Sequence, residues 1–247
     1  MSSKKALNLS RYYSINFNKT KRQKKSIKFI IIHYTGMKKE SKAIQKLCDY
    51  RSKVSSHYFI KNNGKTLNLV PDLYEAWHAG NSRWKKFKSL NQHSIGIEIS
   101  NPGHDHGYKK FSSKQILSLI KLLRHLIKKY KIEKKDILGH SDIAPSRKKD
   151  PGEKFPWKEL SKKKLCIWHN LNENKIKTYR KTRLSSHNEN IFFKNLHKIG
   201  FRKIKNINLD QNNKYMVKAF QRRFRQALVN GKIDLECLLI SKNLIKS

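Results

Sequence analysis

The chain has 247 residues, of which 57 are Lys or Arg and 17 are Asp or Glu, so its formal net charge is +40. This length allows one large domain, or a medium and a small one, each with a buried core. The hydrophobic fraction of 37% lies in dense local runs, which excludes a wholly disordered polycation, and the charge excludes an ordinary neutral or acidic cytosolic protein.

The basic excess has two interpretations. Of the 57 basic residues, 45 are Lys and 12 are Arg. A Lys-rich surface either attracts a polyanion, such as nucleic acid, a membrane surface or a wall polymer, or is a solvated coat. Nucleic-acid readers concentrate Arg forks and aromatic platforms, and neither pattern is concentrated here. We therefore expect incidental polyanion binding, with charge alone naming no partner.

The first third of the chain predicts strands and one helix. Residues 1–26 are basic and are expected to form a mobile arm. The apolar, β-branched run at residues 28–33 predicts a buried strand, and residues 41–48 have the spacing of a short helix. Residues 56–60 and 66–70 predict a hairpin, because the Asn-Gly pair between them supplies the positive φ angles of a tight turn.

The middle of the chain alternates strand and helix signals. Residues 94–99 alternate as a strand does, and residues 113–130 have helical periodicity with Ser112 or Ser113 placed to cap the first turn. Residues 136–140 predict another short strand. Interleaved strands and helices predict an α/β fold with a mixed central sheet flanked by helices, and we assign it to residues 27–169.

The last third has a different composition. Residues 170–187 carry many charges and amides and few apolar residues, which is typical of a linker. Residues 188–247 predict a small domain of three helices, with Gly200 as the stop signal of the first. The three cysteines, Cys48, Cys166 and Cys237, are widely spaced, which predicts no disulfide framework and favours a reducing compartment.

Three potential metal ligands stand at the ends of predicted strands or in the loop that follows one of them. His33 and His140 each end one, and Asp150 follows in a loop. The ends of strands on one edge of a sheet are where α/β proteins build sites. Two imidazoles and a carboxylate, with a fourth position open, suit a catalytic Zn²⁺. A single His after an apolar strand is more often a structural residue, so that interpretation stays open.

Two further residues are candidates for catalysis. Glu98 interrupts an otherwise apolar strand, where a carboxylate needs either a partner or a function. A salt bridge to one of the many lysines is one explanation. If Glu98 faces the metal, it can take a proton from water and return it to a leaving amine. Lys148 could neutralise a developing oxyanion, although a single Lys among 45 is a weak signal.

Six segments of the chain together are similar to one protein family. They are FIIIHYTG, VSSHYFI, LVPDLYEAWHAG, LNQHSIGIEISNPG, GHSDIAPSRKKDPGEKFPW and VKAFQRRFRQALVNGKID. The chain resembles the bacterial zinc N-acetylmuramoyl-L-alanine amidases of the amidase type 2 family, relatives of phage amidase lysozymes and peptidoglycan recognition proteins. The resemblance runs from about residue 26 to about residue 240, and its last segment lies in a peptidoglycan-binding-like helical domain.

The resemblance implies a role for each candidate residue. It implies one Zn²⁺ held by His33, His140 and Asp150, with Glu98 as general base and then acid and Lys148 as the stabiliser of the transition state. The substrate-binding residues that it implies are His57, Trp77, His78, Ala79, Gly80 and Asn101. A core position for Trp77 and a structural position for His57 stay open.

The expected function is zinc-dependent hydrolysis of the amide bond between N-acetylmuramic acid, or its 1,6-anhydro form, and L-alanine of the stem peptide. Peptidoglycan or muropeptides are the expected partners, and the expected state is a monomer. The alternatives are a catalytically weak recognition protein and a basic nucleic-acid-binding protein. No signal peptide, lipid-anchor Cys or membrane-spanning run is visible, so we expect a cytoplasmic location, with a periplasmic or envelope-associated one as the alternative.

Overall fold

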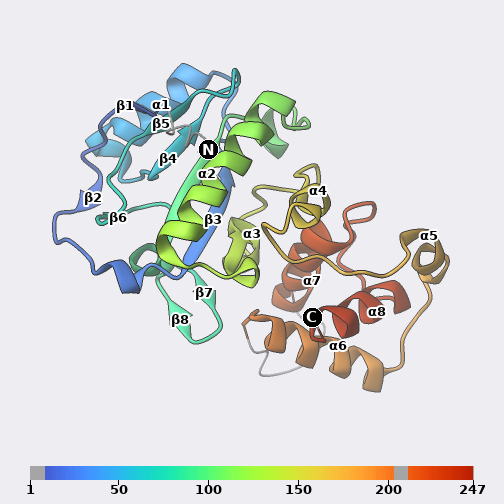
Figure 1. Cartoon of the computed structure of the whole chain (residues 1–247). Coiled ribbons are helices and arrows are strands. Elements are labelled where there is room, and N and C mark those ends of the chain that lie inside the picture. Colours follow the sequence, from blue (N-terminus) through green and yellow to red (C-terminus); the bar gives the residue numbers. More distant parts are fainter. Residues whose placement is uncertain (1–8, 203–210, 247) are drawn as a thin grey trace, which may run out of the picture. The chain divides into compact units, whose positions relative to one another are not determined.

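The computed structural model describes residues 9–202 and 211–246 (Figure 1). The chain divides into two compact units: one holds the residues up to 80 and 90–138, and the other holds 81–89 and the residues from 139 onward. The strands are β1 (Leu9–Arg11), β2 (Phe17–Asn18), β3 (Phe29–Tyr34), β4 (Tyr58–Ile60), β5 (Thr66–Asn68), β6 (Glu75–Ala76), β7 (Arg83–Trp84), β8 (Phe87–Lys88), β9 (Ser94–Ile99) and β10 (Ile137–Gly139). The helices are α1 (Glu40–Cys48), α2 (Ser113–Tyr130), α3 (His140–Ile143), α4 (Trp157–Lys162), α5 (Glu173–Ile176), α6 (Ser186–Ile199), α7 (Gln211–Phe224) and α8 (Leu235–Leu244).

A mixed sheet carries the site. Within the described residues it has six strands in the order β1-β5-β4-β9-β3-β10. Strand β9 pairs in parallel with both β3 and β4, and β4 pairs antiparallel with β5, which confirms the predicted mixed sheet and hairpin. The first five residues of β3 are buried, because both faces of the sheet are covered, and this explains their continuous apolar run.

Helices α1 and α2 cover opposite faces of this sheet. Ala43 and Leu47 of α1 share a hydrophobic cluster with Phe59 of β4. Tyr58 points to the other face, since neighbouring residues of a strand alternate. Its hydroxyl donates to Asp72 over 2.6 Å, and Tyr130 of α2 donates to the same carboxylate over 2.7 Å. Of the two predicted caps of α2, Ser112 is the one used.

The prediction of a mobile N-terminal arm is wrong for residues 12–26. Ser14 and Asn16 are buried, and Ser14 Oγ donates to the backbone oxygen of Leu47 over 2.6 Å. The amide of Asn16 donates to the backbone oxygens of Asp49 and Val54 over 2.8 and 2.9 Å. These hydrogen bonds join polar side chains to backbone groups that are distant in the chain. Hydrophobic periodicity therefore does not predict them. Residues 1–8 lie outside the described residues.

The second unit contains the three helices predicted near the C-terminus. The rings of Phe192 in α6 and Phe220 in α7 meet edge to face at 5.1 Å, and Asn195 of α6 donates to Ser241 of α8 over 3.0 Å. Gly200 ends α6 as predicted, at φ +135°, and a Cβ there would lie 2.4 Å from the indole of Trp84.

The segment expected to be a linker is partly structured. It contains α5, and Arg180 pairs with the buried Glu236 over 2.7 Å. The division into four segments, with an arm at 1–26, a catalytic domain at 27–169, a linker at 170–187 and a helical domain at 188–247, stays a prediction, apart from the mobility of the arm. Among the described residues, no helix combines the length and the hydropathy that a membrane span needs.

Candidate metal centre

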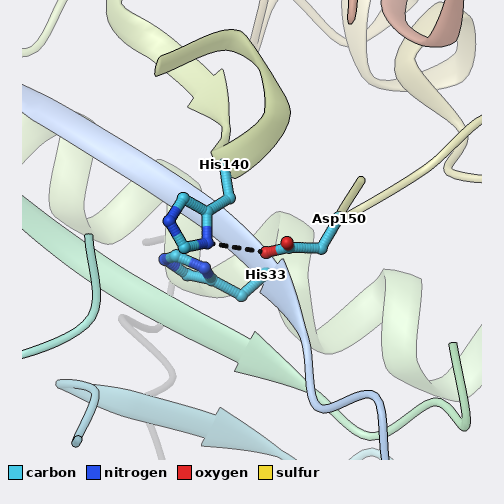
Figure 2. Close-up of side chains that lie close together, drawn as sticks. All are labelled: His33, His140 and Asp150. Atoms are coloured by element: carbon cyan, nitrogen blue, oxygen red, sulfur yellow. Dashed lines mark hydrogen bonds and ion pairs between the residues drawn. The ribbon is translucent and has the colours of Figure 1, made fainter. Parts of the chain in front are cut away.

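Three donor groups come together where the sequence predicted ligands (Figure 2). His33 is the fifth residue of β3, His140 follows β10 as the first residue of α3, and Asp150 comes ten residues later. One ligand atom of each residue lies within 4.8 Å of the other two. All three residues are buried, with 1%, 3% and 6% of their surface exposed.

The loop from Gly139 to Asp150 holds two of the donors together. The Nδ1 atom of His140 lies 3.1 Å from Oδ2 of Asp150. The backbone N–H of Ser141, next to His140, donates to the backbone oxygen of Asp150 over 2.9 Å. Side chains and backbone therefore bind the two ends of the loop to each other.

A chain of hydrogen bonds sets the tautomer of His33. Ser94 Oγ donates to the backbone oxygen of Leu90 over 2.6 Å, so it accepts from Nε2 of His78, 3.2 Å away. In a neutral His78 ring, Nδ1 then carries the lone pair and accepts from Nε2 of His33 over 3.1 Å. The proton of His33 is thus on Nε2, and Nδ1 offers the lone pair that a metal requires.

The donor set fits zinc. Two imidazoles and one carboxylate are ligands of catalytic zinc sites, which keep a fourth position for water or substrate. At metal–ligand distances of about 2.0–2.1 Å, two ligand atoms of a tetrahedral ion lie about 3.3 Å apart. The 3.1 Å between His140 and Asp150 is close to that separation. Among the described residues, His33, His140 and Asp150 are the group of His, Cys, Asp or Glu side chains whose donor atoms lie close enough together to hold a metal ion.

Gly96 makes room for His78. This glycine lies on β9, and a Cβ added to it would come within 2.4 Å of the His78 ring. No positive φ is involved at this position. The missing side chain therefore lets the imidazole of His78 pack over the strand, two residues from Glu98 and on the same face.

Gly96→Ala is therefore expected to weaken metal binding. The new methyl group displaces the His78 ring and breaks its bond to His33, and loss of such a supporting partner typically costs about 10- to 100-fold in metal affinity. Zinc titration against a chromogenic chelator measures the effect. Ile95→Val is the control, because Ile95 is buried on the opposite face of the same strand and its shortening leaves His78 in place. Equal zinc affinities of Gly96→Ala and wild type would contradict the assignment.

Glu98 lies beside His33. The parallel pairing of β3 with β9 sets His33 opposite Glu98, and strands in register present paired residues on the same face. Phe59 of β4 is the partner of Glu98 on the other side. The carboxylate is half-buried and has an apolar neighbour on one flank and a metal donor on the other. The pairing of the strands thus places Glu98 on the same face of the sheet as His33.

His57 has a structural environment. Its ring is fully buried, and Nδ1 accepts the backbone N–H of Gly96 over 3.0 Å, while Nε2 donates to the backbone oxygen of Tyr74 over 3.0 Å. Burial and the neighbouring guanidinium of Arg22 lower the pKa of His57 to about 3. The ring is therefore neutral at physiological pH, and its ring centroid lies 5.6 Å from that of His78. A contact of His57 with substrate stays a prediction.

The segment from Trp77 to Gly80 is held by its backbone. The carboxamide oxygen of Asn91 accepts the N–H groups of His78 and Ala79 over 3.1 and 2.6 Å. Trp77 is half-exposed, so it is not a core residue, and its indole N–H donates to the side chain of Asn18 over 3.0 Å. Gly80 is exposed at φ +57°. Their roles in substrate binding stay predictions.

Asn101 and Lys148 are the remaining candidates. The side chain of Asn101 is buried, donates to the backbone oxygen of Lys109 over 2.8 Å and accepts from the N–H of Gly103 over 3.0 Å, so its amide shapes the loop after β9. Lys148 is half-buried in the loop between His140 and Asp150, and its N–H donates to Ala144 over 3.0 Å. Both assigned roles stay predictions.

The sequence interpretation missed the supporting residues. Ser94 and Asn91 are polar residues without a motif of their own. Ser94 makes one hydrogen bond to the His78 ring, and Asn91 accepts two from the backbone of His78 and Ala79. A serine at the start of an apolar strand is the signal that was available for Ser94. For Asn91 the sequence offers none, since its partners are backbone groups twelve and thirteen residues away.

Comparison with known proteins identifies relatives of the chain. Residues 23–153 match the family described as N-acetylmuramoyl-L-alanine amidase. The N-acetylmuramoyl-L-alanine amidase AmiD of Escherichia coli is 32% identical over 232 residues, which cover 89% of this chain and 83% of AmiD. The 1,6-anhydro-N-acetylmuramyl-L-alanine amidase AmpD of Haemophilus influenzae is 38% identical over 109 residues, 44% of this chain and 57% of AmpD.

Solved structures agree with the sequence comparison. AmiD from E. coli, in complex with the substrate anhydro-N-acetylmuramic acid-L-Ala-D-gamma-Glu-L-Lys, has a TM-score of 0.78 at 30% identity, covering 93% of this chain and 91% of its own. AmpDh3 from Pseudomonas aeruginosa, in complex with anhydromuramic pentapeptide, has a TM-score of 0.77 at 27% identity, covering 93% and 95%. The likeness thus includes the C-terminal helices as well as the sheet.

Proposed function

The chain belongs to the N-acetylmuramoyl-L-alanine amidase family, and from this we propose that it uses one Zn²⁺, held by His33, His140 and Asp150, to hydrolyse the amide bond between a muramic acid residue and L-alanine. The observation that carries the proposal is the meeting of three buried donors at one point, with Glu98 paired in register beside one of them. If His33 and His140 had only a structural role, no carboxylate would be needed beside His33, where Glu98 lies.

Glu98 and Lys148 have distinct tasks in this proposal. When bound, zinc supplies a Lewis acid that acidifies water and polarises an amide carbonyl. Glu98 accepts the proton of the attacking water as the C–O bond forms, and it returns that proton to the nitrogen of L-alanine as the C–N bond breaks. Lys148 offsets the negative charge that develops on the carbonyl oxygen. The proton is conserved through the cycle, so Glu98 ends ionised and ready for the next turnover.

Anhydromuropeptides are the substrate class that we propose first. Two relatives bind such compounds in their solved structures, one with an anhydro-N-acetylmuramic acid tripeptide and one with an anhydromuramic pentapeptide. Intact peptidoglycan is the alternative substrate. The +40 charge is available to attract anionic glycan or peptide carboxylates from a distance, with an effect that salt would screen.

Removal of the metal is expected to stop turnover. The purified protein is incubated with anhydromuropeptide and with sacculi, with and without a chelator, and the products are identified by mass spectrometry. We expect a free stem peptide beginning with L-alanine, no product after chelation, and recovery with added zinc. Binding of substrate without cleavage would favour a recognition protein, and salt-sensitive DNA binding without cleavage would favour a nucleic-acid-binding protein.

Two expectations stay predictions in this proposal. The first is a cytoplasmic location, with the periplasm or cell envelope as the alternative, and cell fractionation with an antibody decides between them. The second is the monomeric state, which sedimentation of the purified chain decides.

A further inference from the structure

A buried ion pair connects a C-terminal helix to the turn that carries His140. Arg223 of α7 donates through Nη1 to Oδ2 of Asp142 in α3, and the two side chains are 2% and 1% exposed. A buried guanidinium is strongly unfavourable unless its charge is matched and its hydrogen bonds are made. The pairing therefore fixes these two residues relative to each other.

Aromatic rings hold the guanidinium in place. Its central carbon lies 4.5 Å from the centroid of the Trp157 ring and 5.0 Å from that of Phe224. Trp157 begins α4 and is itself buried. Stacking of this kind favours the planar guanidinium of Arg over the compact ammonium of Lys. Arg223 is thus confined by stacking as well as by its charge partner.

Asp142 connects Arg223 to the backbone next to the metal ligands. The same Oδ2 atom accepts the backbone N–H of Gly139 over 2.7 Å, and Gly139 is the residue directly before His140. A Cβ on Gly139 would lie 2.7 Å from Pro151, the residue directly after Asp150. The carboxylate of Asp142 therefore sits at the base of the loop whose two ends supply His140 and Asp150.

We propose that Arg223 is a positioning residue of the metal centre. Through Asp142 it holds the backbone on which His140 and Asp150 stand, so the C-terminal helices contribute to metal binding as well as to any contact with peptidoglycan. This inference rests on the proposed function, because it assumes that the three donors bind zinc. It assigns Arg223 no contact with the substrate or with the reacting atoms.

The chain contains a matched control for this proposal. Arg225, just past the end of α7, is also buried and also paired, with Asp234 over 2.9 Å and with Glu236 over 3.4 Å. Glu236 belongs to α8, and Asp234 is the residue that caps that helix. Substitution of Arg225 removes a buried guanidinium from an ion pair, as substitution of Arg223 does, and leaves Asp142 untouched.

The test compares zinc affinity in Arg223→Met and Arg225→Met. Competition with a chromogenic chelator gives the affinity, and circular dichroism checks that each protein is folded at the temperature used. We expect Arg223→Met to bind zinc about 10- to 100-fold more weakly, the usual effect of losing a supporting partner, and Arg225→Met to stay within about threefold of wild type. Turnover of Arg223→Met should recover as zinc is raised, because the substrate contacts are intact.

Conservative variants keep the test decisive if a methionine variant does not fold. Arg223→Lys and Arg225→Lys retain the charge, and only the first is expected to weaken zinc binding, because the ammonium cannot reproduce the fork and the stacking. Equal losses at the two positions, or no loss at either, would overturn the proposal. A wild-type protein that binds no zinc would instead overturn the proposed function, so the two failures are distinguishable.

Discussion

Glu98→Gln is expected to keep its zinc and to lose turnover by a factor of about 10² to 10⁴, the range attributed to a positioned general acid–base group. The amide has almost the shape of the carboxylate, so the half-buried position between His33 and Phe59 is preserved. It cannot accept a proton from water at neutral pH. Zinc content and catalysis should therefore separate in this variant.

The measurement needs both quantities from one preparation. Emission spectroscopy gives the zinc per chain, and release of L-alanyl peptide from a soluble muropeptide gives the rate. Glu159→Gln is the control, since it makes the same chemical change on an exposed position of α4. Wild-type turnover in Glu98→Gln would reject its role as base, and loss of zinc there would indicate that Glu98 contributes to the metal centre itself.

Asp150→Ala is expected to lower zinc affinity by more than about 100-fold and to abolish turnover. Loss of a group that only supports a ligand typically costs about 10- to 100-fold, and removal of the ligand itself should cost more. The substitution also takes away the anion 3.1 Å from Nδ1 of His140. Two neutral imidazoles then remain, with less negative charge to bind a divalent cation.

Chelator competition and emission spectroscopy measure this loss. Asp49→Ala is the comparison, because it deletes a carboxylate that pairs with Arg51 over 2.9 Å at the surface. Zinc binding of Asp49→Ala should equal that of wild type. Full zinc content in Asp150→Ala would exclude this residue as a ligand and would reduce the centre to the two histidines.

Periodicity in the sequence was sufficient for the elements that position the site. The apolar run before His33, the alternation around Glu98 and the helical spacing of residues 113–130 each recover an element of the structure. These signals are local, because they arise from whether a face of a strand or helix is buried. The short strands β1, β2, β6, β7 and β8 escaped prediction. Strands β2, β6, β7 and β8 have two residues each, too few to show a period, and β1 lies in the basic N-terminal segment.

The identity of the family was also contained in the sequence. The segments around His33, Glu98 and Asp150 carry the resemblance, and the comparisons confirm it over most of the chain. Composition contributed little, because a charge of +40 with 45 lysines is compatible with several partners. Composition also misled the prediction for the N-terminal residues. Their many charges indicated a mobile arm, although Ser14 and Asn16 are buried.

The amino-acid sequence by itself therefore determined the fold class, and it indicated His33, His140 and Asp150 as candidate ligands and Glu98 as a candidate base. Only the tertiary structure decided that the three donors meet, that Ser94 and His78 set the tautomer of His33, and that Arg223 reaches the His140 turn through Asp142. The reason is physical. Burial leaves a periodic record along the chain, whereas a hydrogen bond or an ion pair between distant residues depends on directions in space that no local pattern encodes.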